Sequence, residues 1–361
     1  MSVTQDQIQH QLASFIDPHT GQDLVSSRQV KHIALDANRL TLRLELGYPA
    51  AGYHTELQAR VTEHLQQGLS LDAIQVEIET RISSHAVQKN LKPLSGVKNN
   101  VAVASGKGGV GKSTTAVNLA LALSAEGARV GILDADIYGP SQPMMLGVKG
   151  KPKTDGSSIF PIRAYGLQSM SIGYLVDEEA PMIWRGPMVT GALQQLLKDT
   201  RWDDLDYLII DLPPGTGDIQ LTLAQQIPVS GAVIVTTPQD IALLDARRGL
   251  NMFAKVSVPV LGIIENMSLH VCSRCGHAEP IFGEGGGQRM AEQCGVPLLG
   301  ALPLDISIRL NADNGHPSVV VEPTGKAARI YFQIARSMAA RLALKARDYS
   351  HRFPTISIVN D

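Results

Sequence analysis

A glycine-rich loop lies between a predicted strand and a predicted helix, and this feature restricts the fold more than any other. The strand is the apolar segment 101–104, and the helix is expected to run from Ser113 to about Ala125. The loop between them has the spacing G-x-x-x-x-G-K-S, which starts at Gly106. A loop of this form, placed after a strand and before a helix, surrounds phosphate oxygens with backbone N–H groups. The alternative is an ordinary glycine-rich turn beside a solvated lysine.

Further apolar segments follow the loop, with helical stretches between several of them, at 129–133, 207–210, 232–235, 260–264 and 298–302. Nearly continuous apolar strands separated by helices indicate a mostly parallel sheet that helices cover on both faces. Right-handed crossovers place the C-terminal ends of these strands along one edge, where ligands bind. We therefore predict an α/β fold of the P-loop NTPase type, with its site at that edge.

The first 90 residues have a different pattern, which indicates a small α+β domain. Its expected elements are a helix, a hairpin, a second helix and a last strand, at 5–16, 30–35 with 40–46, 55–67 and 74–78. We expect a domain at 1–90, a linker at 91–99, the P-loop domain at 100–346 and an irregular tail at 347–361.

Composition excludes several classes of protein. Hydrophobic residues make up 44% of the chain, which is too many for a wholly disordered protein. The net charge of −2 and the aromatic content of 4% argue against a nucleic-acid partner. No apolar run reaches about 18 residues, so we expect no membrane partner. The absence of a predicted signal peptide and the count of three cysteines favour a cytoplasmic location.

The phosphate-binding loop supplies most of the candidate nucleotide contacts, and the helix N-terminus adds positive partial charge. Lys112 is expected to reach the β- and γ-phosphates, the Ser113 hydroxyl to bind Mg²⁺, and Thr114 to contact the α-phosphate. The full set of predicted contacts from the loop is Gly106, Lys107, Gly108, Gly109, Val110, Gly111, Lys112, Ser113 and Thr114.

The loop resembles the deviant Walker A motif of the MinD/ParA/nitrogenase-iron-protein class, because it carries a second lysine, Lys107. In that class the extra lysine crosses a homodimer interface and acts on the partner's nucleotide, as an arginine finger does. The resemblance implies that Lys107 and Lys112 are catalytic. The alternative for Lys107 is an ordinary surface lysine.

Three aspartates at strand ends resemble the switch I and Walker B motifs of the same class. The resemblance implies that Asp136 positions the attacking water and that Asp134 is a Mg²⁺ ligand or a scaffold group. Asp211, which precedes a Pro-Pro-Gly-Thr-Gly segment, is expected to hold Mg²⁺, through water. Each aspartate could instead cap a helix. Asn266 resembles the adenine-reading residue, with Pro303 as a wall of the base site.

Cys272 and Cys275 form a C-x-x-C pair that can bring two sulfurs to one metal centre, with Arg274 helping to stabilise the thiolate. Two thiolates leave a tetrahedral metal or a cluster incomplete. A symmetric dimer would present two such pairs, and four cysteines could bind one [4Fe–4S] cluster. A structural zinc site is the main rival. Cys294 is expected to pack in the interior, and His277 is not expected to be a ligand.

The motifs together resemble the Mrp/ApbC iron–sulfur cluster carrier ATPases over about residues 98–345. The distinguishing segments are Asp134–Ser141, Asp211–Asp218, Glu265–Ser268 and the cysteine pair. The N-terminal unit resembles an iron–sulfur assembly domain, although 47–52 lacks the cysteine that such domains often carry.

This resemblance implies a homodimer that binds ATP and Mg²⁺, hydrolyses ATP slowly and passes a labile [4Fe–4S] cluster from scaffold proteins to apo-proteins. Three other functions stay open. They are a MinD/ParA-like positioning ATPase, a reductase like the nitrogenase iron protein, and a nucleotide switch whose dimer is stabilised only by zinc.

Overall fold

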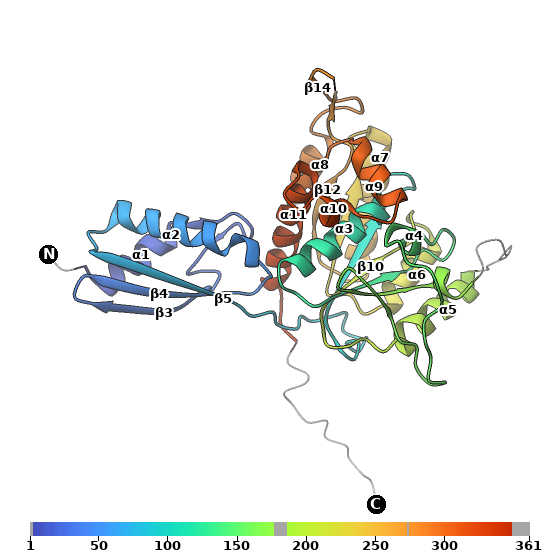
Figure 1. Cartoon of the computed structure of the whole chain (residues 1–361), viewed down its shortest axis with the longest axis horizontal. Coiled ribbons are helices and arrows are strands. Elements are labelled where there is room, and N and C mark those ends of the chain that lie inside the picture. Colours follow the sequence, from blue (N-terminus) through green and yellow to red (C-terminus); the bar gives the residue numbers. More distant parts are fainter. Residues whose placement is uncertain (1–2, 177–185, 273, 349–361) are drawn as a thin grey trace, which may run out of the picture.

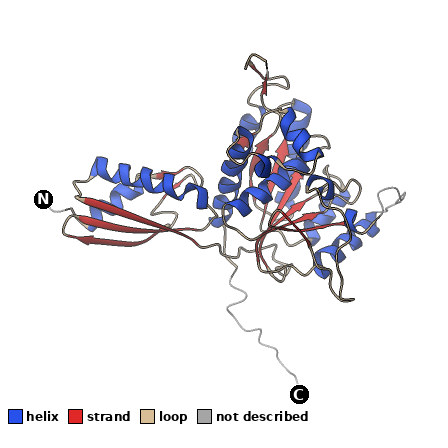
Figure 2. Cartoon of the chain, in the orientation of Figure 1, coloured by secondary structure: helices blue, strands red, loops and turns tan. Residues whose placement is uncertain are grey.

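The two larger sheets of the described chain lie in separate units, each with its own helices, and two short two-stranded ladders complete the strands (Figures 1 and 2). The computed structural model describes residues 3–176, 186–272 and 274–348. Most of the expected tail, 349–361, lies outside the described residues. One of the two larger sheets has eight strands, and the other, near the N-terminus, has three.

The large sheet has the strand order β15-β12-β11-β6-β10-β7-β9-β8. Its strands are β6 (Val97–Ser105), β7 (Val130–Asp134), β8 (Ile162–Ala164), β9 (Leu167–Ser171), β10 (Leu205–Asp211), β11 (Gly231–Thr236), β12 (Val260–Glu265) and β15 (Leu298–Ala301). Every neighbouring pair is parallel except β8 with β9. The predicted mostly parallel sheet is therefore confirmed. β6 begins at Val97, so it includes the end of the segment expected to be a linker.

Helices cover both faces of the large sheet (Figure 2). They are α3 (Lys112–Ala125), α4 (Gln142–Met145), α5 (Gly186–Asp199), α6 (Asp218–Gln226), α7 (Asp240–Lys255), α8 (Gly286–Cys294), α9 (Ile306–Asp313), α10 (Ser318–Val321) and α11 (Lys326–Ala343). Alternate residues of β6 enter different apolar clusters: Val101 packs with α3 and α11, and Ala102 packs with α5 to α8. None of the described helices is both long and apolar enough to span a membrane.

The N-terminal unit is a small α+β domain, as predicted. Its elements are α1 (Gln5–Ala13), β1 (Ile16–Asp17), β2 (Gln22–Asp23), β3 (Val30–Asp36), β4 (Arg39–Leu46), the short 3₁₀ helix η1 (Ala51–Tyr53), α2 (His54–Gly68) and β5 (Ala73–Thr80). β4 lies between β3 and β5, and its alternate residues Leu40, Leu42 and Leu44 are buried in the apolar core that includes residues of α1 and α2. α1 ends before Ile16, which instead begins β1.

The two units meet at the C-terminal end of α3. The Glu126 carboxylate accepts a hydrogen bond from the Gly52 backbone N–H at 2.8 Å and one from Arg336 Nε at 2.9 Å. The Arg336 guanidinium also lies over the Tyr53 ring, 5.4 Å from its centroid. The helix that begins at the phosphate-binding loop therefore ends against the N-terminal unit.

We predict that Glu126→Ala lowers the free energy of unfolding by about 3 kcal/mol, because it leaves the Arg336 charge buried without its carboxylate. The side chains of Glu126 and Arg336 are only 3% and 13% exposed. Urea unfolding of the full chain measures the effect. The control is Arg309→Ala, which removes an ion pair with Asp313 whose side chains are 61% and 54% exposed. The control should change stability by about 0.5 kcal/mol or less, and equal losses in both variants would contradict the prediction.

Candidate functional site

The phosphate-binding loop connects the end of β6 to the start of α3, as the sequence predicts. Gly109 and Gly111 both have φ of +82°, a left-handed conformation that favours glycine. A Cβ atom at Gly111 would collide with the Asn266 amide, and one at Gly106 would collide with the backbone of α7. Glycine is therefore required at both ends of the loop.

A cavity of about 300 Å³ lies over this loop. Its lining comprises Ser105, Lys107, Gly108, Gly109, Gly111, Lys112, Ser113, Thr114, Asp136, Gly139, Ser141, Met145 and Pro214. Most of these lining residues are candidate site residues that were named from the sequence. Four candidate contacts, Gly106, Val110, Asn266 and Pro303, are outside the lining.

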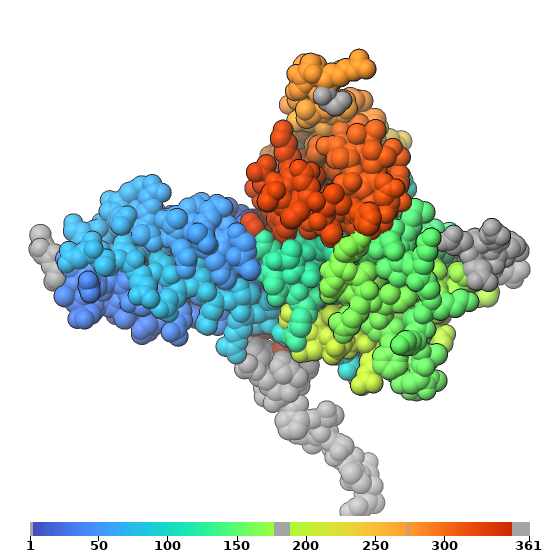
Figure 3. Space-filling model, in the orientation of Figure 1, coloured from blue at the N-terminus to red at the C-terminus, as the bar shows by residue number. Residues whose placement is uncertain are grey.

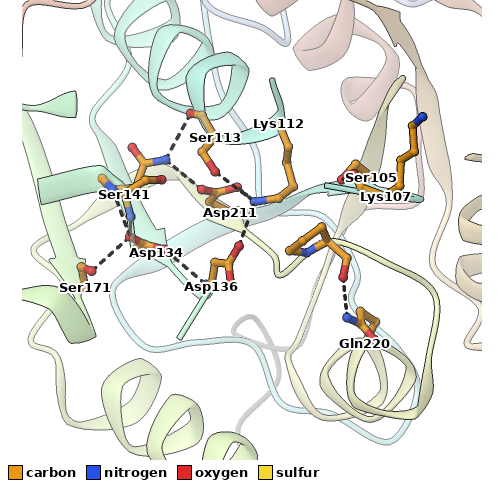
Figure 4. Close-up of polar contacts among 12 residues, drawn as sticks. Ser105, Lys107, Lys112, Ser113, Asp134, Asp136, Ser141, Ser171, Asp211 and Gln220 are labelled. Carbon is orange, nitrogen blue, oxygen red and sulfur yellow. Dashed lines mark hydrogen bonds and ion pairs between the residues drawn. The ribbon is translucent and has the colours of Figure 1, made fainter. Parts of the chain in front are cut away.

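One lysine faces three carboxylates beside this cavity (Figure 4). Lys112 Nζ contacts Asp211 Oδ1, lies 3.9 Å from Asp136 Oδ2 and donates to Ser113 Oγ at 3.1 Å. Asp134 ends β7, Asp136 follows it, and Asp211 ends the neighbouring strand β10. The parallel sheet thus brings these groups together from three separate segments of the chain.

Asp134, Asp136 and Asp211 are all buried, and among the described residues Lys112 is the only cation that pairs with them, through Asp136 and Asp211. Burial is the main cause that raises the pKa of Asp134 to about 7, and the nearby Asp211 charge contributes to the same rise. Burial also raises the pKa of Asp136. Such a site favours an added cation, and the Ser113 hydroxyl and Asp211 carboxylate are the hard oxygen ligands that Mg²⁺ prefers.

Asp134 organises the loop that follows it. Its Oδ1 accepts the Asp136 N–H at 3.2 Å, and its Oδ2 accepts the N–H groups of Ser141 and Gln142, both at 3.0 Å. The Ser171 hydroxyl donates to the same Oδ2 at 3.1 Å. Because both oxygens already accept hydrogen bonds, this geometry supports the scaffold alternative for Asp134 over the direct Mg²⁺ ligand.

Lys107 lies apart from this group of charges (Figure 4). Its carbonyl oxygen accepts a hydrogen bond from the Ser105 hydroxyl at 2.9 Å, which fixes the start of the loop. Within the described part of the chain, its ammonium makes no ion pair. The geometry therefore leaves this ammonium free to act outside its own loop.

Two glutamines at this site were not predicted from the sequence. The Gln142 side chain is fully buried and donates to Asp211 Oδ2 at 2.9 Å. Gln220 donates to the Pro214 carbonyl at 2.6 Å and so supports the loop after Asp211. Gln142 directly follows the Asp134–Ser141 segment, and this position was the one signal that could have identified it.

Asn266 connects the phosphate-binding loop to a second segment. Its Nδ2 donates to the Val110 carbonyl at 2.9 Å, and its own N–H donates to the Thr236 carbonyl at 2.7 Å. The chain then runs beside Leu302 and Leu304, where Ser268 donates to the Leu302 carbonyl. Asn266 therefore holds the loop in place, and its role in reading adenine stays a prediction, as does that of Pro303.

The two cysteines lie six and nine positions after Asn266, on a projecting hairpin (Figures 1 and 3). The hairpin strands are β13 (His270–Val271) and β14 (Ala278–Glu279). Cys272 N–H donates to the His277 carbonyl, and Gly276 N–H donates to the Cys272 carbonyl, both at 2.9 Å. Cys275 is exposed and Cys272 is half-buried.

The backbone of the hairpin favours the thiolate at Cys272. Hydrogen bonds from the N–H groups of Arg274 and then Cys275 lower the pKa of Cys272. Arg274 thus contributes through its backbone. Cys294 instead ends α8 and packs against an apolar cluster. Across the described residues, no three His, Cys, Asp or Glu side chains converge to hold a metal ion.

Comparison with known proteins relates both units to iron–sulfur cluster proteins. A family model described as NUBPL iron-transfer P-loop NTPase matches residues 96–339, and one described as iron-sulfur cluster assembly protein matches residues 5–78. The chain is 52% identical to the iron-sulfur cluster carrier protein of Escherichia coli K12 over 92% of this chain and 90% of that protein.

Two solved structures are similar to the larger unit. One is a nucleotide-binding protein from Archaeoglobus fulgidus in complex with ADP, with a TM-score of 0.57 and 35% identity, covering 65% of this chain and 91% of that one. The other is the cell division ATPase MinD of Pyrococcus furiosus, with a TM-score of 0.50 and 22% identity, covering 66% and 98%. The second likeness concerns the fold alone. The chain therefore belongs to the NUBPL iron-transfer family of P-loop NTPases, with an N-terminal domain of the iron–sulfur cluster assembly family.

Proposed function

We propose that this protein is an ATP-dependent iron–sulfur cluster carrier, which takes its cluster from scaffold proteins and delivers it to apo-proteins in the cytoplasm. The observation that carries the proposal is the projecting hairpin, where Cys272 and Cys275 have no third ligand among the described residues. A centre that each chain holds through only two bonds has few bonds to break when it is released. The 52% identity to a protein named as a carrier supports the same conclusion.

The number of thiols supports a homodimer. Iron in a [4Fe–4S] cluster is usually held by four cysteine thiolates, and one chain presents two. Two hairpins related by a two-fold axis would supply all four. Exposed apolar side chains lie near the cysteines. They are Leu269 and Val271 just before Cys272, and Ile281 after the hairpin, and a partner chain would cover them.

The nucleotide site would use the charged groups already described. Lys112 would exchange Asp211 for the β- and γ-phosphates, while Ser113 and Asp211 would hold Mg²⁺, Asp211 through water. Bound Mg²⁺ neutralises phosphate charge. Asp136 would orient the attacking water, and the partner's copy of Lys107 would stabilise the charge that develops in the transition state. We expect slow hydrolysis, as suits a conformational switch.

Asn266 offers a route by which the nucleotide would act on the cluster. Its side chain holds the Val110 carbonyl in the phosphate-binding loop, and the hairpin with Cys272 begins a few residues later. A shift of the loop on nucleotide binding would therefore move the base of the hairpin. The distance between the two cysteine pairs in a dimer would change with it, which would favour loading in one state and release in another.

We predict that Cys272→Ala and Cys275→Ala each abolish cluster loading and leave ATP affinity within about twofold, because each removes two of the four ligands from a dimer. Anaerobic reconstitution followed by analysis of iron, sulfide and zinc per chain measures loading. Cys294→Ala is the matched control and should load normally. Normal loading in either hairpin variant would refute the assignment, and zinc without sulfide in the wild type would favour a structural metal.

Substitution of Lys107 and of Lys112 should have different effects on ATP hydrolysis and on ATP affinity. We predict that Lys107→Ala lowers the ATP hydrolysis rate about 10³-fold with little change in ATP affinity, as for loss of a residue that acts in trans. Lys112→Ala should weaken ATP binding about 10-fold to 100-fold, because it removes charge-assisted hydrogen bonds to phosphate. Single-turnover hydrolysis and equilibrium binding distinguish the two. The exposed Lys198 on α5 provides the control, Lys198→Ala. Hydrolysis at the wild-type rate by Lys107→Ala would exclude the crossing role.

A further inference from the structure

Gln142 is a buried residue at the nucleotide site to which the mechanism above gives no role. It is the first residue of α4, directly after the loop that Asp134 organises, and its side chain is fully buried. Its Nε2 donates to Asp211 Oδ2 at 2.9 Å and to the Ser113 carbonyl at 3.1 Å. One amide group therefore joins α4 to the end of β10 and to the first turn of α3.

These hydrogen bonds fix the orientation of the Asp211 carboxylate. Lys112 contacts Oδ1 and Gln142 contacts Oδ2, so both oxygens have a donor and the carboxylate plane cannot rotate freely. The terminal torsion of an aspartate is otherwise broad. Mg²⁺ requires nearly ideal octahedral geometry, so the orientation of a nearby carboxylate affects its binding. If Lys112 turns to the phosphates, the Gln142 amide would remain the side-chain donor to Asp211 among the described residues.

The carbonyl oxygen of the Gln142 amide lacks a hydrogen-bond donor. Among the described residues, Oε1 of Gln142 is buried without a hydrogen-bond partner. A buried carbonyl oxygen without a partner costs about 1–3 kcal/mol, so it requires an explanation. A water molecule in the hydration shell of a cation near Ser113 and Asp211 would supply the missing donor.

We propose that Gln142 is a positioning residue for Mg²⁺: it acts through Asp211, and its amide is set by the place of α4 against the phosphate-binding loop. This inference rests on the proposed nucleotide site and extends it to a residue outside the P-loop and Walker B motifs. Groups that orient metal ligands typically contribute 10-fold to 100-fold to metal affinity.

The test is a Mg²⁺ titration of the binding of a fluorescent ADP analogue to the full-length protein. Gln142→Met keeps the length and volume of the side chain and removes both donors. We expect the Mg²⁺ concentration at half-maximal enhancement to rise about tenfold, with binding in EDTA unchanged within about twofold. Should Gln142→Met fail to fold, Gln142→Asn retains the amide on a side chain one methylene shorter, and it should shift the titration in the same direction.

The control is Gln168→Met on β9, which removes another buried amide. Gln168 donates to the Asp203 carbonyl at 3.0 Å and accepts its N–H at 2.9 Å, at the opposite end of β9 from Ser171. It should leave the Mg²⁺ titration unchanged within about twofold while lowering thermal stability by a similar amount, because it loses a comparable pair of hydrogen bonds. Equal Mg²⁺ titrations in the two variants would show that Gln142 is only structural and would overturn the inference.

A double-mutant cycle with Asp211→Asn tests whether Gln142 acts through this carboxylate. The effect of Gln142→Met on the Mg²⁺ titration should largely vanish in the Asp211→Asn background, because the two residues form one unit. Additive effects would contradict the inference while leaving the nucleotide site intact. A wild-type protein that binds no ADP would instead refute the proposed site itself.

Discussion

The nucleotide site depends on the interaction of Lys112 with the carboxylates around it, which outnumber it three to one. Three carboxylates lie beside one lysine in a largely buried setting, where water can screen their repulsion only weakly. The two apolar clusters on either face of the sheet hold the ends of β7 and β10 in place and so maintain this arrangement. A ligand that brings a cation and gives the lysine a new partner would reduce this repulsion.

Two contacts connect the phosphate-binding loop and its helix to other parts of the chain. α3 begins at Lys112 and ends beside Glu126, which contacts Gly52 in the N-terminal domain. On another side, Asn266 holds Val110 and leads into the cysteine hairpin. The loop is therefore linked both to the exposed thiols and to the N-terminal domain. Under the proposed function, a shift of the loop on nucleotide binding would act on both the cysteine hairpin and the N-terminal domain.

Local sequence patterns predicted the sheet and the phosphate-binding loop because each depends on residues close together in the chain. Ser105 to Ser113 form one short motif, and the apolar strands are continuous. The β9 strand was missed because its buried Gln168, Ser169 and Ser171 are polar and find their partners in the fold. Gln142 was missed for a related reason, since its partner Asp211 lies 69 positions later. The scaffold geometry of Asp134 likewise depends on hydrogen bonds that sequence does not show.

We propose that one chain cannot complete the iron–sulfur centre, so that cluster loading and dimer formation are a single event. Native mass spectrometry of anaerobically reconstituted wild-type protein tests this most directly, because it gives the number of chains and the inorganic content of each species together. We expect one species with two chains and a single [4Fe–4S] cluster. A cluster-loaded single chain, or a dimer that holds only zinc, would contradict it.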